Sequence, residues 1–408
     1  MKDCKIAQML QAQKKHLSFH TPGHKRAGAD ITELSYSDNL LSPTGVIKEA
    51  QEDAAKLLGA ERTFFLTDGS SAGVHAMLFA LKARGVKKIA YSAFSHVSVK
   101  NGCQMLGLQG AEIPPRTERG IPCQPTVQEI EQALKAADAL LLTAPDYYGN
   151  FPPLKEAKAL CEKAGKPLLI DGAHGSHLHF EECYAGNFAA MWVDGLHKSL
   201  PALTQGAAVS AKSAAWAEAL QEGVSLFRTT SPSYPILASV EYAIKYPRNE
   251  KIERAAEEFK KQHGAYPNAD WSKLLIPFGE RAFEAQRFLE AHGVYPEFND
   301  GNYLMFYLSP CTNQSALKKL GKLLQGLPRG EVKDGREESF SAGGTAAWVP
   351  LSSSVGRVCA RECGIFPPCV PVIFQGERVS ERAVKKLACA KNTFGLQDKH
   401  ILVYGEKG

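Results

Sequence analysis

The feature that most limits the fold is an alternation of short apolar runs with helix-like stretches between about residues 45 and 215. The runs expected to be strands are Lys88–Tyr91, Ala139–Thr143, Pro167–Ile170, Met191–Val193 and Ala207–Ser210. They lack strict apolar–polar alternation, which is typical of strands buried on both faces. Because helical stretches separate them, the pattern predicts an α/β domain with a mostly parallel sheet between helices.

The helices expected in this region are Pro43–Leu58, Ala72–Arg84, Thr126–Ala137 and Leu154–Ala164. The third has a clear beginning, since Thr126 followed by Glu129 matches a capping box. After about residue 245 the pattern changes to that of a smaller α+β domain. We therefore expect an N-terminal segment and large domain over residues 1–262, and a C-terminal small domain over residues 263–408.

Composition excludes several classes of protein. The 408 residues are 44% hydrophobic and 22% charged, as in ordinary globular proteins. The net charge of +5 comes from scattered basic residues, so nothing indicates nucleic-acid binding. No apolar run approaches the roughly 18 residues of a membrane span, and the N-terminus lacks the apolar core of a signal peptide. We expect a cytoplasmic protein that binds neither nucleic acid nor membrane.

The first candidate site is the turn TDGSSAGVHAM at Thr67–Met77. Gly69, Ser70 and Ser71 precede a helical stretch, so their amides and hydroxyls could bind phosphate at a helix beginning. The segment is not a P-loop, because no Gly-Lys-Ser/Thr follows it. A capped turn without a ligand is the alternative interpretation.

The second candidate is LLIDGAHGSHLHF at Leu168–Phe180, where Asp171 directly follows an apolar strand. A carboxylate there could pair with a protonated ring nitrogen. His174, His177 and His179 also allow a zinc or iron site with the aspartate. The third interpretation is a turn whose histidines are all satisfied within the protein.

The third candidate is VDGLHKSLPALTQGAAV at Val193–Val209, which contains Lys198. A lysine among apolar neighbours can have a lowered pKa and form a Schiff base, whereas most loop lysines are simply exposed. Taken together, a phosphate turn, a strand-end aspartate and a later lysine fit one ligand, pyridoxal 5′-phosphate (PLP). Their order in an α/β chain matches fold-type I PLP enzymes.

Longer motifs extend this match. The chain contains FHTPGHK at Phe19–Lys25, DNLLSPTGVIKEAQEDAAKLLGAERTFFLTDGSSAG at Asp38–Gly73, and later SHVSVKNG, APDYYG, DGAHGSH, HKSLPALTQGA, LFRTTSPSY, SSVGRV and FPPCVPVIFQGE. In these motifs it resembles the Orn/Lys/Arg decarboxylase family, in the short form without an N-terminal wing domain. The resemblance implies an aspartate aminotransferase-like large domain that binds PLP, a smaller C-terminal domain and a homodimer or higher homo-oligomer.

The resemblance also assigns roles by position. Lys198 matches the lysine that binds the cofactor aldehyde, Asp171 the partner of the pyridine nitrogen, and His96 the histidine stacked on the ring. The remaining cofactor contacts that it implies are Ser70, Ser71, Ala173, His174 and His197. No metal is implied. Phe19–Lys25 and Thr229–Tyr234 are expected to border the active site, from the partner subunit of the dimer.

The implied reaction is decarboxylation of a basic amino acid (lysine, arginine or ornithine) to an amine and CO₂, as in polyamine biosynthesis. The alternatives are a PLP-dependent aminotransferase or lyase that acts on another amino acid, and a non-catalytic paralogue with a degraded site. The chain departs from the family pattern at Gly172, and its further departures at Asp68, Gly195, Leu196 and Arg361 are the reason for the non-catalytic alternative. Arg361 in particular stands where the family has an acid, so an acidic substrate is also open.

Overall fold

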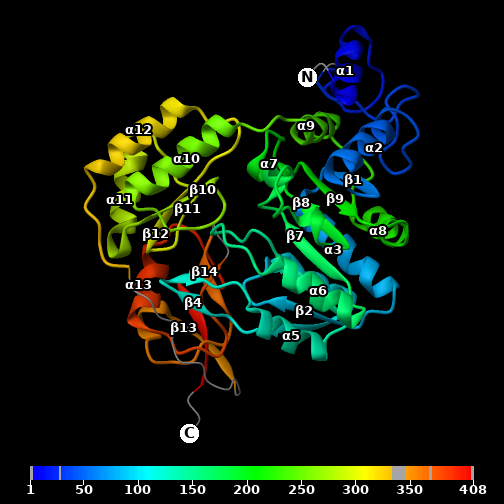
Figure 1. Ribbon diagram of the computed structural model, residues 1–408. Coiled ribbons are helices and arrows are strands. Elements are labelled where there is room, and N and C mark those ends of the chain that lie inside the picture. The colour runs from blue at the N-terminus through cyan, green and yellow to red at the C-terminus, as the bar shows by residue number, and fades with distance from the viewer. Residues whose placement is uncertain (1–2, 27–28, 333–344, 367–369, 406–408) are drawn as a thin grey trace.

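A central sheet of seven strands organises the computed structural model, which describes residues 3–26, 29–332, 345–366 and 370–405. Its strands, in order across the sheet, are β1 (Arg62–Leu66), β9 (Ala207–Ala211), β8 (Met191–Asp194), β7 (Leu168–Gly172), β6 (Ala139–Thr143), β2 (Lys88–Ser92) and β3 (Gln109–Ile113). The neighbours from β8 to β3 pair in parallel, and β9 runs antiparallel to β8 and β1 (Figure 1). The mostly parallel sheet is confirmed.

Two core clusters cover the two faces of this sheet. The first contains side chains from α1 (Lys5–Ala12), α2 (Val46–Leu58), α5 (Val127–Ala136), α6 (Leu154–Ala164) and α9 (Tyr234–Ile244). The second contains side chains from α3 (Gly69–Ala83), α4 (Val97–Leu106) and α8 (Ala214–Phe227). Leu140 and Leu142 of β6 face the first cluster and Leu141 faces the second, which explains the continuous apolar runs.

The predicted helices and strands of this domain are present with small shifts of their ends. Thr126 and Glu129 form the expected capping box at the beginning of α5. Sequence analysis missed β1 and β3. The failure to predict β3 has a physical reason. This strand is an edge strand with largely exposed side chains, so it lacks an apolar run.

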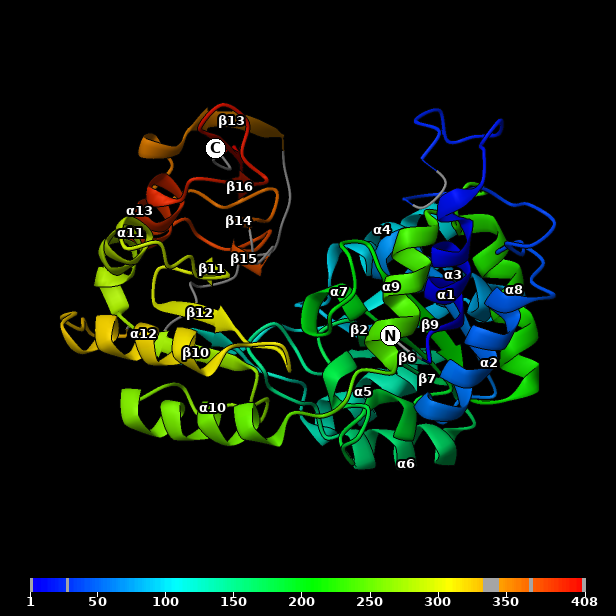
Figure 2. The ribbon, with the colours of Figure 1, turned by 90° about the horizontal axis from the view of Figure 1, so that it is seen from above.

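A second sheet is antiparallel, with the order β10 (Lys273–Pro277), β12 (Tyr303–Tyr307) and β11 (Phe298–Asn299). Its helices are α10 (Glu250–His263), α11 (Ala282–Ala291) and α12 (Gln314–Gln325). Figure 2 shows these elements beside the large sheet. The hairpin β4 (Thr117–Glu118) and β5 (Ile121–Pro122) reaches them from the large domain, since Ile121 packs against Leu275 and Met305.

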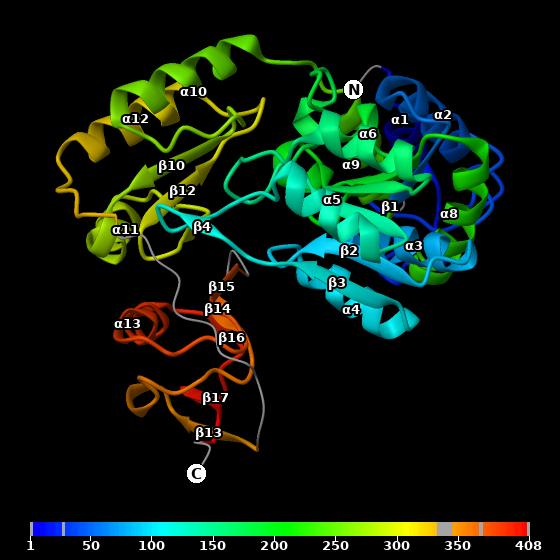
Figure 3. The same cartoon turned by 60° about the horizontal axis from the view of Figure 1, so that its bottom comes forward.

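The C-terminal residues form a further unit with its own small core, visible below the second sheet in Figure 3. It contains α13 (Glu381–Cys389) and the strands β13 (Ala346–Pro350), β14 (Cys363–Ile365), β15 (Val370–Ile373), β16 (Thr393–Phe394) and β17 (His400–Tyr404). The remaining helical segments are α7 (Leu196–Ser199) and the 3₁₀ turns Gln13–Lys15, Ser176–Leu178, Ala185–Asn187, Gly279–Arg281 and Leu351–Ser353.

The placement of α10 bears on the domain division. Ile252, Ala256 and Phe259 on this helix pack with Leu274 and Leu304 of the second sheet. This packing groups α10 with the second sheet, whereas the expected boundary at residue 263 would leave this helix in the large domain. The division into two domains remains a prediction. Among the described helices, none has the length and apolar character to cross a membrane.

Candidate active site

Parallel pairing brings two of the candidate segments to one edge of the sheet. In the register of β7 and β8, Asp171 lies opposite Val193 and Gly172 opposite Asp194. The loops that follow both strands therefore begin side by side at the carboxyl edge, where α/β proteins bind ligands. Gly195 allows this approach, because a Cβ atom there would lie 2.5 Å from the carbonyl oxygen of Ala173.

Lys198 lies on α7 and reaches across to the loop after β7. Its Nζ is 3.1 Å from Nε2 of His174, which is buried. Burial lowers the pKa of His174 well below its ordinary value, and the charges of Lys198 and Lys273 add to this effect. His174 is therefore neutral at physiological pH, and its Nε2 can accept a hydrogen bond from the Lys198 ammonium group.

Asp171 and His96 belong to the same electrostatic environment. Asp171 is buried, and its Oδ1 accepts a hydrogen bond of 3.1 Å from the amide of Ala173, which is also buried. His96 caps α4 by accepting a bond from the amide of Ser98. Burial lowers the pKa of His96, the Asp171 charge opposes this, and the Lys198 charge reinforces it.

Ser70 and Ser71 occupy the first turn of α3, where both are half-buried. The loop before β9 connects this turn to α7. The amide of Gly69 donates to the carbonyl of Gln205 at 2.9 Å, and the amide of His197 donates to the carbonyl of Gly206 at 3.0 Å. The predicted phosphate-contacting residues thus come from adjacent segments, and their ligand contacts remain predictions.

Sequence analysis missed the residues from the small domain that hold His174. The Tyr307 hydroxyl donates to the His174 carbonyl at 3.2 Å, and Nζ of Lys273 lies 3.4 Å from the same oxygen. The rings of Tyr147 and His174 lie 4.5 Å apart. Lys273 is fully buried and forms an ion pair with the fully buried Asp270. No sequence motif indicates Asp270 or Lys273, because acidic and basic residues beside an apolar strand are common in protein sequences.

The other histidines have partners within the protein. His177 Nε2 lies 2.9 Å from Oδ1 of Asp270, and His179 Nδ1 lies 2.9 Å from the carbonyl of Ser176. Within the described ranges, no three His, Cys, Asp or Glu side chains converge as metal ligands would. One ring nitrogen of His177 and of His179 is thus paired, whereas His177 Nδ1 and His179 Nε2 are buried without a hydrogen-bond partner among the described residues. The interpretation as a turn with satisfied histidines therefore holds only in part.

The remaining predicted segments lie in different surroundings. Phe19 is 92% exposed in the Phe19–Lys25 segment. The amide of Thr229, in the Thr229–Tyr234 segment, lies 3.4 Å from Oδ2 of Asp68. Arg361 is exposed, and its guanidinium lies over the ring of Trp348. The placement of the two segments against a partner subunit remains a prediction.

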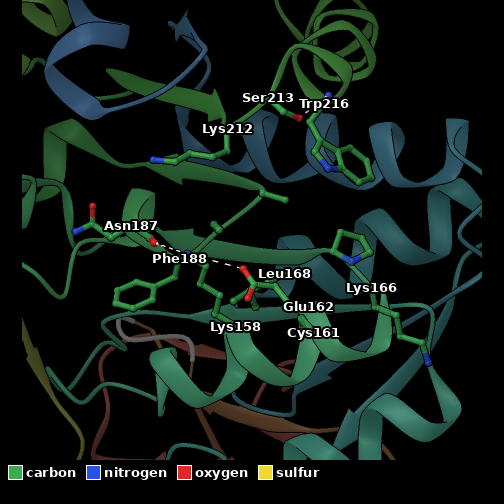
Figure 4. A pocket seen from close by; sticks show the side chains of 14 residues that line it. Lys158, Cys161, Glu162, Lys166, Leu168, Asn187, Phe188, Lys212, Ser213 and Trp216 are labelled. Atoms are coloured by element: carbon green, nitrogen blue, oxygen red, sulfur yellow. Dashed lines mark hydrogen bonds and ion pairs between the residues drawn. The ribbon is translucent and has the colours of Figure 1, made fainter.

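A separate pocket lies at the opposite edge of the sheet (Figure 4). It is lined by Lys158, Lys166, Lys212 and Trp216, among others. Nζ of Lys212 donates to the carbonyls of Gly59 and Gly186, and Nζ of Lys166 donates to the carbonyl of Leu134. Because backbone carbonyls already occupy these amines, this pocket lacks a group comparable to Lys198.

The residues at the carboxyl edge fit PLP. Lys198 supplies an amine, Asp171 a buried carboxylate, and α3 a helix beginning with two hydroxyls. The backbone leaves room beside that turn, since Gly69 has a φ of +78° and an added Cβ would meet nothing within 4 Å. The donor set therefore matches a phosphate, a ring nitrogen and an aldehyde.

Comparison with solved structures gives the same fold. The structure matches the E. coli constitutive lysine decarboxylase with a TM-score of 0.74 at 19% identity, over 98% of this chain and 82% of that chain. It also matches an SPT structure with PLP, with a TM-score of 0.58 at 15% identity, over 79% of this chain and 83% of that chain. These likenesses confirm the expected fold-type I architecture.

Sequence comparison identifies the family. The chain is 30% identical over 444 residues to the arginine decarboxylase of Bacillus anthracis, covering 91% of this chain and 89% of that protein. It is 26% identical over 475 aligned residues to the uncharacterized protein YaaO of Bacillus subtilis, covering 98% of both. The model of the Orn/Lys/Arg decarboxylase major domain matches residues 23–265. The chain therefore belongs to the Orn/Lys/Arg decarboxylase family.

Proposed function

We propose that this chain is a PLP-dependent decarboxylase that converts lysine, arginine or ornithine to the corresponding amine and CO₂. The observation that carries the proposal is the contact of Lys198 with His174, three residues after the buried Asp171, at the carboxyl edge of the sheet. A half-buried amine and a buried carboxylate at the same edge of the sheet are the groups that PLP requires. Family membership supports decarboxylation over other PLP reactions.

The residues of this chain would have the following roles in binding the cofactor and in the reaction. PLP, when bound, withdraws electrons from the substrate bond that loses CO₂. Lys198 holds the cofactor and carries an exchangeable proton at Nζ. Asp171 keeps a proton on the ring nitrogen, because a buried carboxylate stabilises a nearby cation. Ser70, Ser71 and His197 bind phosphate, and His96 and Ala173 hold the two faces of the ring.

His174 would orient the amine of Lys198. Because His174 is neutral, its Nε2 accepts from the ammonium form and directs Nζ toward one side. Tyr307 and Lys273 fix the backbone of His174 from the small domain. These contacts would keep the Nζ of Lys198 in place through His174.

The proposal extends to the setting of the reaction. Amines of this class are precursors of polyamines, and we assign the chain to that biosynthesis in the cytoplasm. We also propose a homodimer, with Phe19–Lys25 and Thr229–Tyr234 at the interface. The 92% exposure of Phe19 supports this placement, since a large apolar side chain is rarely so exposed without a partner.

The test uses the purified full chain with PLP. Covalent capture should produce an absorption band between about 410 and 430 nm. Lys198→Ala should remove both the band and the activity, whereas Lys212→Ala, a lysine at the opposite edge of the sheet, should leave both. Lysine, arginine, ornithine and glutamate are then offered separately, and CO₂ and amine are measured.

Each result decides between the candidate functions. CO₂ and amine from one basic amino acid support the proposal. A band with transfer of the amino group, and no CO₂, indicates an aminotransferase. CO₂ from glutamate alone assigns an acidic substrate, in keeping with Arg361. A chain that develops no band at saturating PLP is a non-catalytic paralogue.

A further inference from the structure

Arg228 has side-chain hydrogen-bond donors that find no partner among the residues that the structure describes. It follows the last residue of α8 and is only 7% exposed. Its Nη2 donates to the carbonyl of Leu40, whereas Nε and Nη1 are buried with no hydrogen-bond partner among the described residues. Buried guanidinium groups are normally fully paired, because unpaired charged donors destabilise the fold. Such a group points to a ligand.

The topology places Arg228 beside the beginning of α3. Leu66 at the end of β1 pairs with Ala207 at the start of β9, so both lie at the carboxyl edge. Helix α8 then returns from the far end of β9 to this edge, packed against α3. The residue after Arg228, Thr229, directs its amide at the carboxylate of Asp68, 3.4 Å away. Asp68 immediately precedes the Gly69–Ser71 turn.

Asp68 creates an electrostatic problem at that turn. A carboxylate at the beginning of a helix interacts well with the helix dipole, but it repels an anion bound at the same end. Arg228 is the charged neighbour that can offset it. Burial lowers the pKa of Arg228 to about 10, and the Asp68 charge opposes that change, so the two groups interact.

Resting on the proposed function, we propose that Arg228 is a phosphate-anchoring residue for the cofactor. Its charge compensates Asp68, and its unpaired N–H groups are donors for the phosphate oxygens. Asp68 and Arg228 thus form a compensating pair, and the pair should matter for PLP but not for pyridoxal, which lacks the phosphate.

The experiment measures binding to the apo-protein of the full chain by titration with PLP and, separately, with pyridoxal. Arg228→Gln should weaken PLP binding by about 10- to 100-fold, the loss expected for a charge-assisted hydrogen bond. Pyridoxal binding should change by less than about twofold. Asp68→Asn should tighten PLP binding, and the double variant Asp68→Asn/Arg228→Gln should recover most of the loss. Arg228→Lys should rescue part of it.

Arg84 provides the matched control. It also follows the last residue of a helix and donates to a carbonyl, that of Ala215, but at the other end of α3. Arg84→Gln should leave the ratio of PLP to pyridoxal affinity unchanged. Thermal unfolding of each variant verifies that it is folded, and Asp68→Asn tests the same pair without altering Arg228.

The outcomes separate this inference from the proposed function. Suppose that the parent chain binds PLP. If Arg228→Gln then weakens the binding of PLP and of pyridoxal equally, or changes neither affinity, Arg228 has only a structural role. The inference is then wrong, whereas the proposed function still stands. An unchanged PLP affinity in Asp68→Asn would also contradict the proposal that Arg228 compensates the charge of Asp68. A parent chain that binds neither compound overturns the proposed function itself.

Discussion

Nζ of Lys198, on α7, lies 3.1 Å from Nε2 of His174, in the loop after β7, although the two residues are 24 positions apart. The contact exists because β7 and β8 are parallel neighbours, so the loops after them begin at the same edge. The small domain reinforces it, since Tyr307 and Lys273 both approach the carbonyl of His174. The amine of Lys198 is thus positioned by a histidine that residues of the second sheet hold in place.

Replacing His174 should separate binding from turnover. His174→Phe keeps an aromatic ring between Tyr147 and Tyr307 but removes the acceptor of the Lys198 bond. We expect the 410–430 nm band to persist, because Lys198 is unchanged, while kcat falls by about 10²-fold, because the amine of Lys198 is no longer oriented. Equal losses of the band and of kcat would contradict this division of roles.

The buried pair of Lys273 and Asp270 should show the effect of leaving one charge without its partner. Lys273→Met should lower the free energy of unfolding by about 3–5 kcal/mol, as measured with urea. The double variant Lys273→Met/Asp270→Asn removes both charges and should be more stable than the single variant.

The exposed pair of Arg254 and Glu250 is the control for this effect. Arg254→Met should change the free energy of unfolding by less than about 1 kcal/mol, because water screens the pair. A double variant no more stable than Lys273→Met would show that packing, rather than the unpaired charge, accounts for the loss.

Gly195 should tolerate no side chain, since an added Cβ would lie 2.5 Å from the carbonyl of Ala173. Gly195→Ala must separate the loops that carry Asp171 and Lys198, so we expect at least about a tenfold loss of PLP affinity. Gly326→Ala is the control, because Gly326 has a φ of −88° and open space around its Cβ position. Unchanged PLP affinity in Gly195→Ala would show that the approach of the loops can relax.

Asp194 should make stability depend on pH. Burial raises its pKa to about 7, and hydrogen bonds from Tyr184 and Trp192 only partly offset this. The folded chain therefore retains a proton that the unfolded chain loses above about pH 4, and the contribution of Asp194 to stability falls as pH rises toward 7. The stability of Asp194→Asn relative to the parent should rise between pH 4 and 7, measured by urea unfolding.

The contribution of Asp138 to stability should depend on pH in the opposite direction to that of Asp194. The amides of Lys87 and Lys88 donate to its carboxylate and lower its pKa. Its contribution is present above about pH 4 and lost as pH falls below that value. Asp138→Asn should therefore be more destabilising at pH 7 than at pH 3, as measured by urea unfolding. As for Asp194, a difference in free energy of unfolding between Asp194→Asn and the parent that does not change between pH 4 and 7 would contradict the raised pKa of its carboxyl group.

Local patterns determined much of this protein in advance. The apolar runs predicted β2, β6, β7, β8 and β9, because a strand buried on both faces must be apolar along its length. The capping box predicted the beginning of α5, because both of its hydrogen bonds lie within one turn. The motifs around Ser70, Asp171 and Lys198 indicated the family, which the sequence comparisons confirm.

Tertiary structure decided what lies between distant segments. The contacts of Tyr307 and Lys273 with the carbonyl of His174 join residues about 100 or more positions apart in the chain. No pattern of neighbouring residues predicts such contacts. The two nitrogens of Arg228 that lack a partner in the described part of the chain, and the approach of Thr229 to Asp68, likewise depend on how α8 returns to α3. Hydrogen bonds and buried charges act over a few ångströms of space, whereas a sequence pattern registers only neighbours along the chain. The sequence therefore carried the chemistry of the site, and the packing of two domains decided how that chemistry is held.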